Sequence, residues 1–414
     1  MEYKKTIAII LVLALVLRIF FALAVPIFQK PDEDAHFEYI EFVADNKKLP
    51  VQGNTYAEFF QPPVYYVIAS FILGFLRIFT ENVWFHVIFM RLISVFFSML
   101  TLYTIYKIAS LIFSNRNLVI GILAFASFLP THINVNSNVT NANMSQFLAT
   151  LIIYFLISNL AKKEDQKRNV LLGGIAGLAL ITRQSVIPAV LTIPFAFAVK
   201  FFPKIKKAVK PVVVIAIISL AISVLFFARN FVLYGDFLAY NAMQMSTPPD
   251  FMPKDLTFVA KLMIWTFASF WATFGRINNV FIGDINSSGG IAILFVFYSL
   301  LLIASLGSVF GLYKVYKKYR KDKKIFTDMQ KNSFIILAFY ILLSGSVFIK
   351  YNLYNFEPQG RYFFHAISGI ALFFTLGIYN LFTKKNENKF LWIYLASFML
   401  IDIISIVRVL QFFY

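Results

Sequence analysis

The stretch from Pro31 to Tyr66 reads PDEDAHFEYIEFVADNKKLPVQGNTYAEFFQPPVYY and follows directly after the first apolar run of the chain. It holds a dense share of the acidic residues, of which the whole sequence has only 20. Its acidic and imidazole side chains are Asp32, Glu33, Asp34, His36, Glu38, Glu41, Asp45 and Glu58. We therefore interpret the rest of the chain as a scaffold for this loop.

The composition is that of a membrane protein. Of the 414 residues 59% are hydrophobic and only 14% are charged, which is too apolar for a soluble domain. Many apolar stretches of about 20 residues predict helices that span a bilayer. No soluble domain of ordinary size is left over, so we expect one all-α polytopic domain over residues 1–414. The absence of cysteine excludes disulfides, thiolate metal sites and cysteine nucleophiles.

A net charge of +18 is typical of proteins that bind nucleic acid, but the distribution of the basic residues excludes nucleic acid as a partner. They lie in short loops between apolar runs, which is the positive-inside pattern of membrane proteins. We expect these loops, and with them the N-terminus, to face the cytoplasm of a cell. The six clusters are Lys4 with Lys5, 107–116, 162–168, 200–210, 314–324, and Lys384 with Lys385 and Lys389.

If all six clusters face the cytoplasm, the chain must cross the membrane an even number of times between each cluster and the next. This condition tests the list of predicted spans. Three apolar runs lie between Lys5 and Lys107, namely Ile7–Phe28, Pro62–Phe79 and Trp84–Phe113. The first run is too long for a signal peptide and has no small-residue cleavage site, so we interpret it as a retained span. The second is short and opens with two prolines. We therefore predict that Pro62–Phe79 is a juxtamembrane or re-entrant helix on the outer side.

The remaining crossings then pair without further adjustment and give about eleven spans, with the C-terminus outside. The first outer loop covers 29–83 and contains interfacial helices. A long outer loop covers 229–288, which we interpret either as an aromatic belt or as a cover over the acceptor. The runs 118–129 and 170–181 are short for a bilayer core of about 30 Å.

The acidic stretch itself has the period of a helix. Pro31 followed by Asp32 is typical of a helix start, with Asp32 as the capping residue. Acidic side chains then recur on one face and apolar side chains on the other, which predicts an amphipathic helix at the membrane surface. The acidic face is Asp34, Glu38, Glu41 and Asp45, and the apolar face is Phe37, Ile40 and Ala44. The plain interpretation of the acidic face is a solvated surface.

The start of that helix has a second interpretation. Asp32 and His36 are four residues apart and share one face, at the membrane edge. A partly desolvated carboxylate there could act as a general base, or hold a divalent metal together with Glu33, His36 or Glu58. Helix capping remains the alternative for Asp32, and the spacing fixes no set of metal ligands.

Two motifs in this loop resemble a known superfamily. They are P-D-E with a histidine three residues after the glutamate, and E-x-x-Q-P-P-x-Y-Y from Glu58 to Tyr66. Together, after one span, they resemble the GT-C superfamily of membrane glycosyltransferases, in particular protein mannosyltransferases, aminoarabinose transferases and a group of uncharacterised homologues. In that superfamily the first outer loop carries an Asp-Glu pair, and the proline corner opens a juxtamembrane helix.

Weaker matches continue toward the C-terminus. The stretch Ser269–Asn278 is similar to S-F-W-x-x-F-G-x-x-N of the uncharacterised homologues, and Gln359–Tyr362 looks like their QGRY. Thr140 and Asn141 resemble the start of an outer N-D motif, but Ala142 replaces the acid, so no role is carried over there.

The resemblance implies an inverting transfer of a sugar from a polyprenyl-phosphate donor to an unknown acceptor, which is a glycan, a lipid or a protein, at the outer face. It implies Asp32 as general base with Glu33 beside it, and Arg361 as the cation on the donor phosphate. The substrate-binding side chains that it implies are His36, Glu58, Gln61, Arg276, Gln359 and Arg361. A divalent metal remains open, with Asp32, Glu33, His36 and Glu58 as candidate ligands.

Each cation also has a plainer interpretation. Arg361 is as compatible with lipid headgroups as with the donor, and Arg276 is flanked by aromatic residues and could anchor an interfacial helix. Arg183 either caps a span or binds the donor. The alternative function is a transporter or flippase of lipid-linked glycans that performs no chemistry. That function predicts charges and broken helices near the membrane midplane, whereas the charges here gather at the outer rim.

Overall fold

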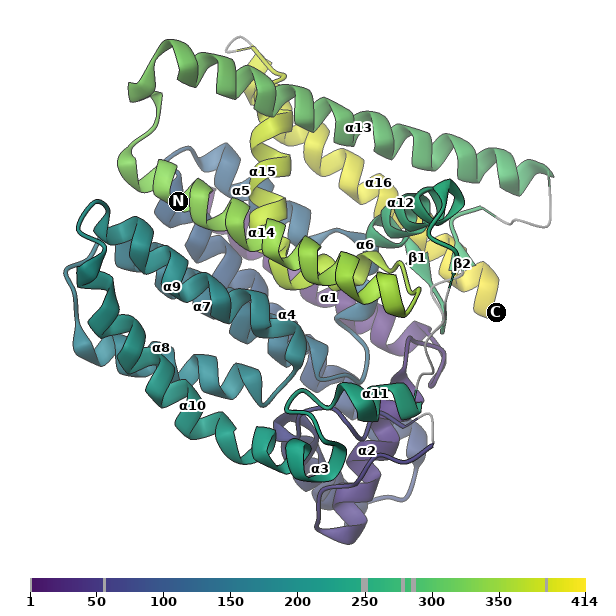
Figure 1. Ribbon diagram of the computed structural model, residues 1–414. Helices are drawn as coiled ribbons and strands as arrows, with labels where there is room; N and C mark the ends of the chain where they lie inside the picture. Colours follow the sequence, from purple (N-terminus) through teal and green to yellow (C-terminus); the bar gives the residue numbers. More distant parts are fainter. Residues whose placement is uncertain (1, 55–56, 247–251, 277–279, 284–287, 384–385) are drawn as a thin grey trace.

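The computed structural model describes residues 2–54, 57–246, 252–276, 280–283, 288–383 and 386–414. Lys384, Lys385 and Asn278, which belong to the motifs above, lie outside these ranges. Nine helices in the described ranges are long and apolar enough to cross a membrane, and they pack alongside one another (Figure 1). They are α1 (Glu2–Ala24), α4 (Val83–Ile112), α7 (Ala142–Leu160), η1 with α9 (Gln184–Phe201), α10 (Lys206–Tyr234), α13 (Ser288–Lys321), α14 (Asp328–Tyr354), η3 with α15 (Gly360–Tyr379) and α16 (Glu387–Phe413). The prediction of an all-α polytopic membrane protein is confirmed.

Two predicted spans are shorter than a bilayer. The run 118–129 forms α5 (Arg116–Ser127) and the run 170–181 forms α8 (Gln166–Leu180). At 1.5 Å per residue these helices rise about 18 Å and about 22 Å, against a hydrocarbon core of about 30 Å. Nine helices in the described residues therefore have the length and hydropathy of a span, and α5 and α8 fall short of that length.

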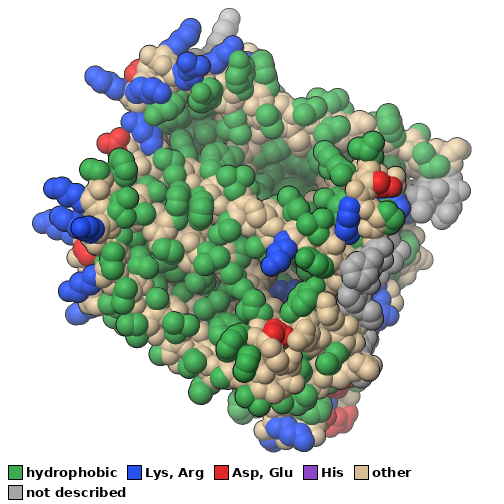
Figure 2. Space-filling model, viewed as in Figure 1, with side chains coloured by type: hydrophobic (Ala, Val, Ile, Leu, Met, Phe, Trp, Pro, Cys, Tyr) green, Lys and Arg blue, Asp and Glu red, His purple; other side chains and the backbone are tan. Residues whose placement is uncertain are grey.

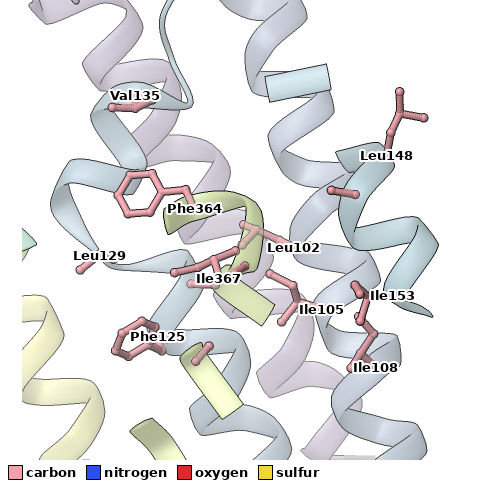
Figure 3. Close-up of a cluster of buried hydrophobic side chains, with 14 of the residues drawn as sticks. Leu102, Ile105, Ile108, Phe125, Leu129, Val135, Leu148, Ile153, Phe364 and Ile367 are labelled. Carbon is pink, nitrogen blue, oxygen red and sulfur yellow. The ribbon is translucent and has the colours of Figure 1, made fainter. Parts of the chain in front are cut away.

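The helix α5 is short because it is enclosed by other helices. Its residues from Leu118 to Ser127 are all buried, and α6 (Pro130–Val135) follows it after a sharp change of direction at Leu129. A helix that is apolar on every side lies either in the core of a larger protein or across a membrane, and the burial of α5 by its neighbours favours the core. Figure 3 shows side chains of α4, α5, α7 and the η3–α15 segment converging in this core, with Phe125 contributed by α5.

The described part of 29–83 forms two short helices, as the sequence predicts. The helix α2 (Glu33–Asn46) buries Phe37, Ile40 and Ala44 and turns its acidic face outward. The helix α3 (Val64–Arg77) has 14 residues and, like α5 and α8, is shorter than the nine candidate spans. It packs against α2 beyond the ends of the long helices (Figure 1).

The segment 229–288 is folded over most of its described length. After the end of α10 it forms α11 (Tyr240–Ser246), α12 (Leu256–Trp271) and a small antiparallel pair, β1 (Thr273–Phe274) with β2 (Val280–Phe281). On the opposite side of the molecule, η2 (Lys323–Ile325) links α13 to α14. Figure 2 shows an apolar surface over the bundle, with many Lys and Arg side chains along one edge and a few elsewhere on this face.

Candidate active site

Asp32 and Arg361 come together from opposite ends of the chain. Arg361 Nη2 donates to Asp32 Oδ2 at 2.7 Å, and the two side chains are 13% and 27% exposed, respectively. Asp32 occupies the N-cap of α2, as predicted, but its side chain makes no capping hydrogen bond. The Nε–H of Arg361 has no hydrogen-bond partner among the described residues. A partly exposed carboxylate therefore lies directly beside a guanidinium whose Nε–H is buried.

The backbone of Asp32 is held from the segment that precedes α7. Asp32 has φ 57° and ψ 16°, in the left-handed region that L-residues other than asparagine and aspartate seldom adopt. On one side of it Asn138 Nδ2 donates to the Pro31 carbonyl at 2.7 Å, and on the other the Val139 amide donates to Glu33 Oε1 at 3.3 Å. These contacts fix the direction in which the Asp32 carboxylate points.

Lys30 also contacts the segment that precedes α7. Its side chain is fully buried, and Nζ donates to Ser137 Oγ at 2.6 Å and to the Asn134 carbonyl at 3.1 Å. Burial, reinforced by the positive charge of Arg91, holds the pKa of Lys30 well below its ordinary value. Lys30 therefore anchors the loop from within rather than offering a solvated cation.

Glu33 forms a fully buried ion pair with Arg91 of α4. Arg91 Nε and Nη2 donate to Glu33 Oε1 and Oε2 at 2.7 and 2.6 Å, in bidentate geometry. The same guanidinium donates to the carbonyls that end α1 and follow it, and Glu33 Oε2 also accepts from the Phe28 amide. Both oxygens of Glu33 are thus occupied, and the pair ties α1, α2 and α4 together.

His36 is likewise engaged on both ring nitrogens. Nδ1 lies 2.7 Å from Tyr66 Oη, and Nε2 lies 3.1 Å from Thr140 Oγ1. Burial, together with the charge of Arg183, lowers the pKa of His36 to about 3, so the imidazole is neutral at physiological pH. The ring of Tyr66 stacks on that of Tyr39 with centroids 3.8 Å apart. His36 therefore joins α2 to α3 and to the segment before α7.

Glu58 and Gln61 extend the site toward a second cation. Gln61 Nε2 donates to Glu58 Oε2 at 2.8 Å, and Asn141 Nδ2 donates to Gln61 Oε1 at 3.3 Å. Asn141 Oδ1 in turn accepts from Arg183 Nη1. This chain of amides connects the proline corner to Arg183. Asn141 is therefore part of the site, although no role could be carried over to it from the sequence.

Glu58 is the residue of this group that titrates near neutrality. Burial, together with the negative charge of Asp32, raises the pKa of Glu58 from an ordinary 4.5 to about 7. Between these values the folded protein holds a proton that the unfolded chain releases, so stability falls as the pH rises through this window. We expect the melting temperature of the wild type in detergent to fall more between pH 5 and pH 8 than that of Glu58→Gln. Equal falls in the two proteins would contradict this assignment.

Arg361 is positioned by a close contact between two of the sequence motifs. The Gly360 amide donates to Ser269 Oγ at 2.7 Å, and a Cβ at Gly360 would overlap the backbone of Phe270. The S-F-W stretch at the end of α12 therefore packs directly on the QGRY stretch at the start of η3. Gln359 is the residue before this helix, and its carbonyl accepts from the Tyr362 amide.

Replacing Gly360 by alanine should disturb this contact. The added methyl group has no space against the Phe270 backbone, so we expect a loss of about 1–3 kcal/mol in stability and a displaced Arg361. Thermal unfolding in detergent measures the loss. Gly174→Ala is the control, because a Cβ at Gly174 has no atom within 4 Å. A Gly360→Ala protein as stable as that control would show that the close packing is not required.

One acidic residue near Arg361 has no counterpart among the predicted site residues. Glu357 Oε2 accepts from Tyr362 Oη at 2.8 Å and from Tyr351 Oη at 3.2 Å.

Arg276, which the sequence predicted to bind substrate, pairs with Asp34 on the exposed side of α2 and is itself 50% exposed. Arg276 therefore joins the β1–β2 region to the first outer loop.

The four candidate metal ligands do not converge. Among the residues that the structure describes, there is no group of three or more His, Asp and Glu side chains that could hold a metal ion. Glu33 is committed to Arg91, and His36 to Tyr66 and Thr140. The residues present do not form the predicted metal site, and no step below depends on a metal.

The comparisons with known proteins agree with this architecture. Residues 61–227 match the family described as dolichyl-phosphate-mannose-protein mannosyltransferase. That region includes Gln61, Asn138, Asn141 and Arg183, and leaves Asp32 and Arg361 outside it. A search of the curated proteins gave no match.

Solved membrane enzymes share the fold. The oligosaccharyltransferase of Archaeoglobus fulgidus, in complex with zinc and sulfate, superposes with a TM-score of 0.57 at 14% identity and covers 97% of this chain. ArnT from Cupriavidus metallidurans bound to undecaprenyl phosphate superposes with a TM-score of 0.55 at 12% identity and covers 92% of this chain. The chain spans 53% and 61% of those proteins, respectively.

A further structure of the archaeal enzyme, AglB, holds an inhibitory peptide and a dolichol-phosphate and superposes with a TM-score of 0.55 at 13% identity. At these identities the likeness concerns the fold. Both comparisons support the expectation drawn from the PDE and QGRY motifs. The chain shares the fold of these solved membrane enzymes, and its residues 61–227 are similar to the dolichyl-phosphate-mannose-protein mannosyltransferase family.

Proposed function

We propose that this protein transfers a sugar from a polyprenyl-phosphate donor to an acceptor, with inversion at the anomeric carbon. The observation that carries this proposal is the pairing of Asp32 with Arg361, partly exposed, between the first outer loop and the start of η3. A carboxylate and a guanidinium are the two groups that a displacement at a glycosyl phosphate requires. The family match at 61–227 supports a lipid-phosphate donor.

The reaction assigns one task to each member of the pair. Asp32 accepts the proton of an acceptor hydroxyl or amine as that atom attacks the anomeric carbon. The bond from that carbon to the phosphate oxygen breaks, and its electron pair leaves with the polyprenyl phosphate. Arg361 stabilises the charge that develops on this leaving group through its guanidinium, which is partly exposed.

Arg183 is the second cation that we assign to the donor. It is partly exposed, and it faces the same group of residues through Asn141, Gln61 and Glu58. The amides orient its guanidinium, which is then available to a phosphate oxygen on its other donors. Glu58 and Gln61 would contact the sugar or the acceptor beside it.

Glu33 takes a positioning role in this proposal rather than a catalytic one. Its carboxylate is fully buried and bidentate on Arg91, so it does not reach the reacting atoms. Its contact with the Val139 amide places Asp32, which is the preceding residue. His36, neutral and bonded on both nitrogens, supports the same loop from α2.

We further propose the predicted topology, with about eleven crossings once α5 and α8 are counted with the nine long helices. The N-terminus is then cytoplasmic and Asp32 faces outside. The gathering of Lys and Arg along one edge of the bundle supports this orientation (Figure 2). Reaction of a membrane-impermeant maleimide with a cysteine introduced at Glu38, in intact cells, tests it. Labelling only after the cells are opened would reverse the orientation.

The alternative function is a flippase for lipid-linked glycans. It differs from a transferase in one observable, because it leaves the sugar–phosphate bond intact. Purified protein in lipid vesicles, supplied with a radiolabelled polyprenyl-phosphate sugar and a mixture of candidate acceptors, should release polyprenyl phosphate. A donor that crosses the bilayer without any release would favour the flippase.

A further inference from the structure

A cavity lies at the basic end of the bundle, away from Asp32. It has a volume of about 330 Å³, which is within the range of small-molecule sites. The ends of α4, α13 and α15 and the starts of α5 and α14 surround it. The helix α15 leads from the Arg361 segment to this cavity, and its 13 residues rise about 20 Å. The cavity is therefore separate from the proposed active site.

The helices α13 and α15 cross in close contact beside the cavity. A Cβ at Gly311 of α13 would overlap the carbonyl of Gly377 of α15, so the two backbones touch there. Val315 and Lys318 lie four and seven residues beyond Gly311, on the same face of α13. Both residues line the cavity, opposite Asn380. The crossing fixes the spacing of the two walls one turn before the cavity begins.

The lining combines apolar walls with polar and cationic groups. Val315, Phe326 and Leu376 supply apolar surface, and Lys318 supplies an ammonium whose contact with Asn380 Oδ1 is long, at 3.4 Å. The surrounding stretch 314–331 contains eight Lys and Arg against two Asp, a net charge of +6. Part of the edge of Lys and Arg in Figure 2 comes from this stretch. An anion with an attached apolar chain fits both features.

We propose that this cavity binds the headgroup of an anionic phospholipid from the leaflet on the basic side. The phosphate lies against Lys318, and the first part of an acyl chain lies against Phe326 and Leu376. A membrane lipid is favoured over a soluble anion because half of the lining residues are apolar and the cavity lies at the ends of helices long enough to span a bilayer. The site neither needs nor alters the sugar-transfer chemistry proposed above.

The test uses the full chain in a neutral detergent. Phosphatidylglycerol and phosphatidylcholine are titrated separately and retained lipid is counted by native mass spectrometry. We expect phosphatidylglycerol to bind preferentially, and Lys318→Ala to weaken its binding about fivefold, as the loss of one lysine near a phosphate predicts. Lys317→Ala is the matched control, because it removes the same charge from a neighbouring exposed position outside the cavity lining. It should change binding less than twofold.

Three outcomes would overturn the proposal. Equal binding of the two lipids would remove the requirement for an anionic headgroup. Equal losses in the two lysine variants would indicate a diffuse basic surface instead of a site. Competition by soluble glycerol phosphate at the concentration of the lipid would show that the ligand is a free phosphate. Because none of these readouts uses sugar transfer, failure here is distinguishable from failure of the proposed function.

Discussion

The Asp32→Asn variant is expected to bind the donor lipid as the wild type does and to lose sugar transfer by about 10²–10⁴-fold, which is the usual contribution of a general base. Asparagine keeps the shape of the side chain and an oxygen for the Arg361 hydrogen bond, but it cannot accept the proton of the acceptor. The loop should stay folded, because Glu33 with Arg91 and Asn138 with Pro31 hold the backbone independently of this carboxylate.

The matched control is Glu38→Gln. Glu38 is an acidic residue on the same helix, but it is exposed and lies on the solvated face. Its substitution should leave transfer unchanged. Transfer is measured as the initial rate of polyprenyl-phosphate release, and donor binding as retention of labelled donor on the immobilised protein. Equal rates in Asp32→Asn and Glu38→Gln would remove Asp32 from the mechanism.

The second large effect is expected from Arg91→Ala, which should lower the free energy of unfolding by about 3–5 kcal/mol. The Glu33 carboxylate would stay buried with its bidentate partner removed, and the carbonyls that follow α1 would lose their donor. Breaking one side of a buried ion pair costs much more than the pair itself contributes, because the remaining charge is uncompensated. Loss of folded protein during purification would be the extreme form of this result.

Arg77→Ala provides the comparison for that experiment. Arg77 pairs with Glu41 and Asp45, which are 37% and 58% exposed. Surface pairs of this kind contribute about 1 kcal/mol or less. Reversible denaturation in mixed micelles should therefore separate the two variants by several kcal/mol. Similar losses in Arg91→Ala and Arg77→Ala would mean that the Glu33 pair does not hold the loop in place.

The sequence predicted the elements of the first outer loop because their signals are local. The helical period of the acidic stretch gave α2 with its buried face, and the two prolines gave the start of the short helix α3. Short helices were harder to judge. Hydropathy measures how apolar a run is, but not whether lipid or protein surrounds it, and α5 is enclosed by protein.

The partners of the site residues could not be predicted from the sequence. The spacing gave Glu33 and His36 the same predicted place beside Asp32. In the structure Glu33 pairs with an arginine 58 residues away, and His36 contacts a threonine 104 residues away. Such contacts depend on the packing of helices that are distant in sequence. Arg91 did carry a signal, since a charge within an apolar run requires a partner, but the sequence did not identify that partner.

The division of labour between Asp32 and Arg361 is the central claim, and a single-turnover titration tests it directly. The rate of sugar transfer is measured at a series of labelled-donor concentrations for the wild type, Asp32→Asn and Arg361→Gln. Each titration gives two quantities, the rate at saturating donor and the donor concentration at half-saturation. We expect Asp32→Asn to lower the saturating rate at an unchanged half-saturation. We expect Arg361→Gln to raise the half-saturation about tenfold or more and to lower the saturating rate as well, since it removes a charged donor that binds the phosphate and stabilises the charge developing on it. Full activity of both variants, or the same parameter changed to the same extent in both, would contradict the assignment of base and phosphate-binding cation.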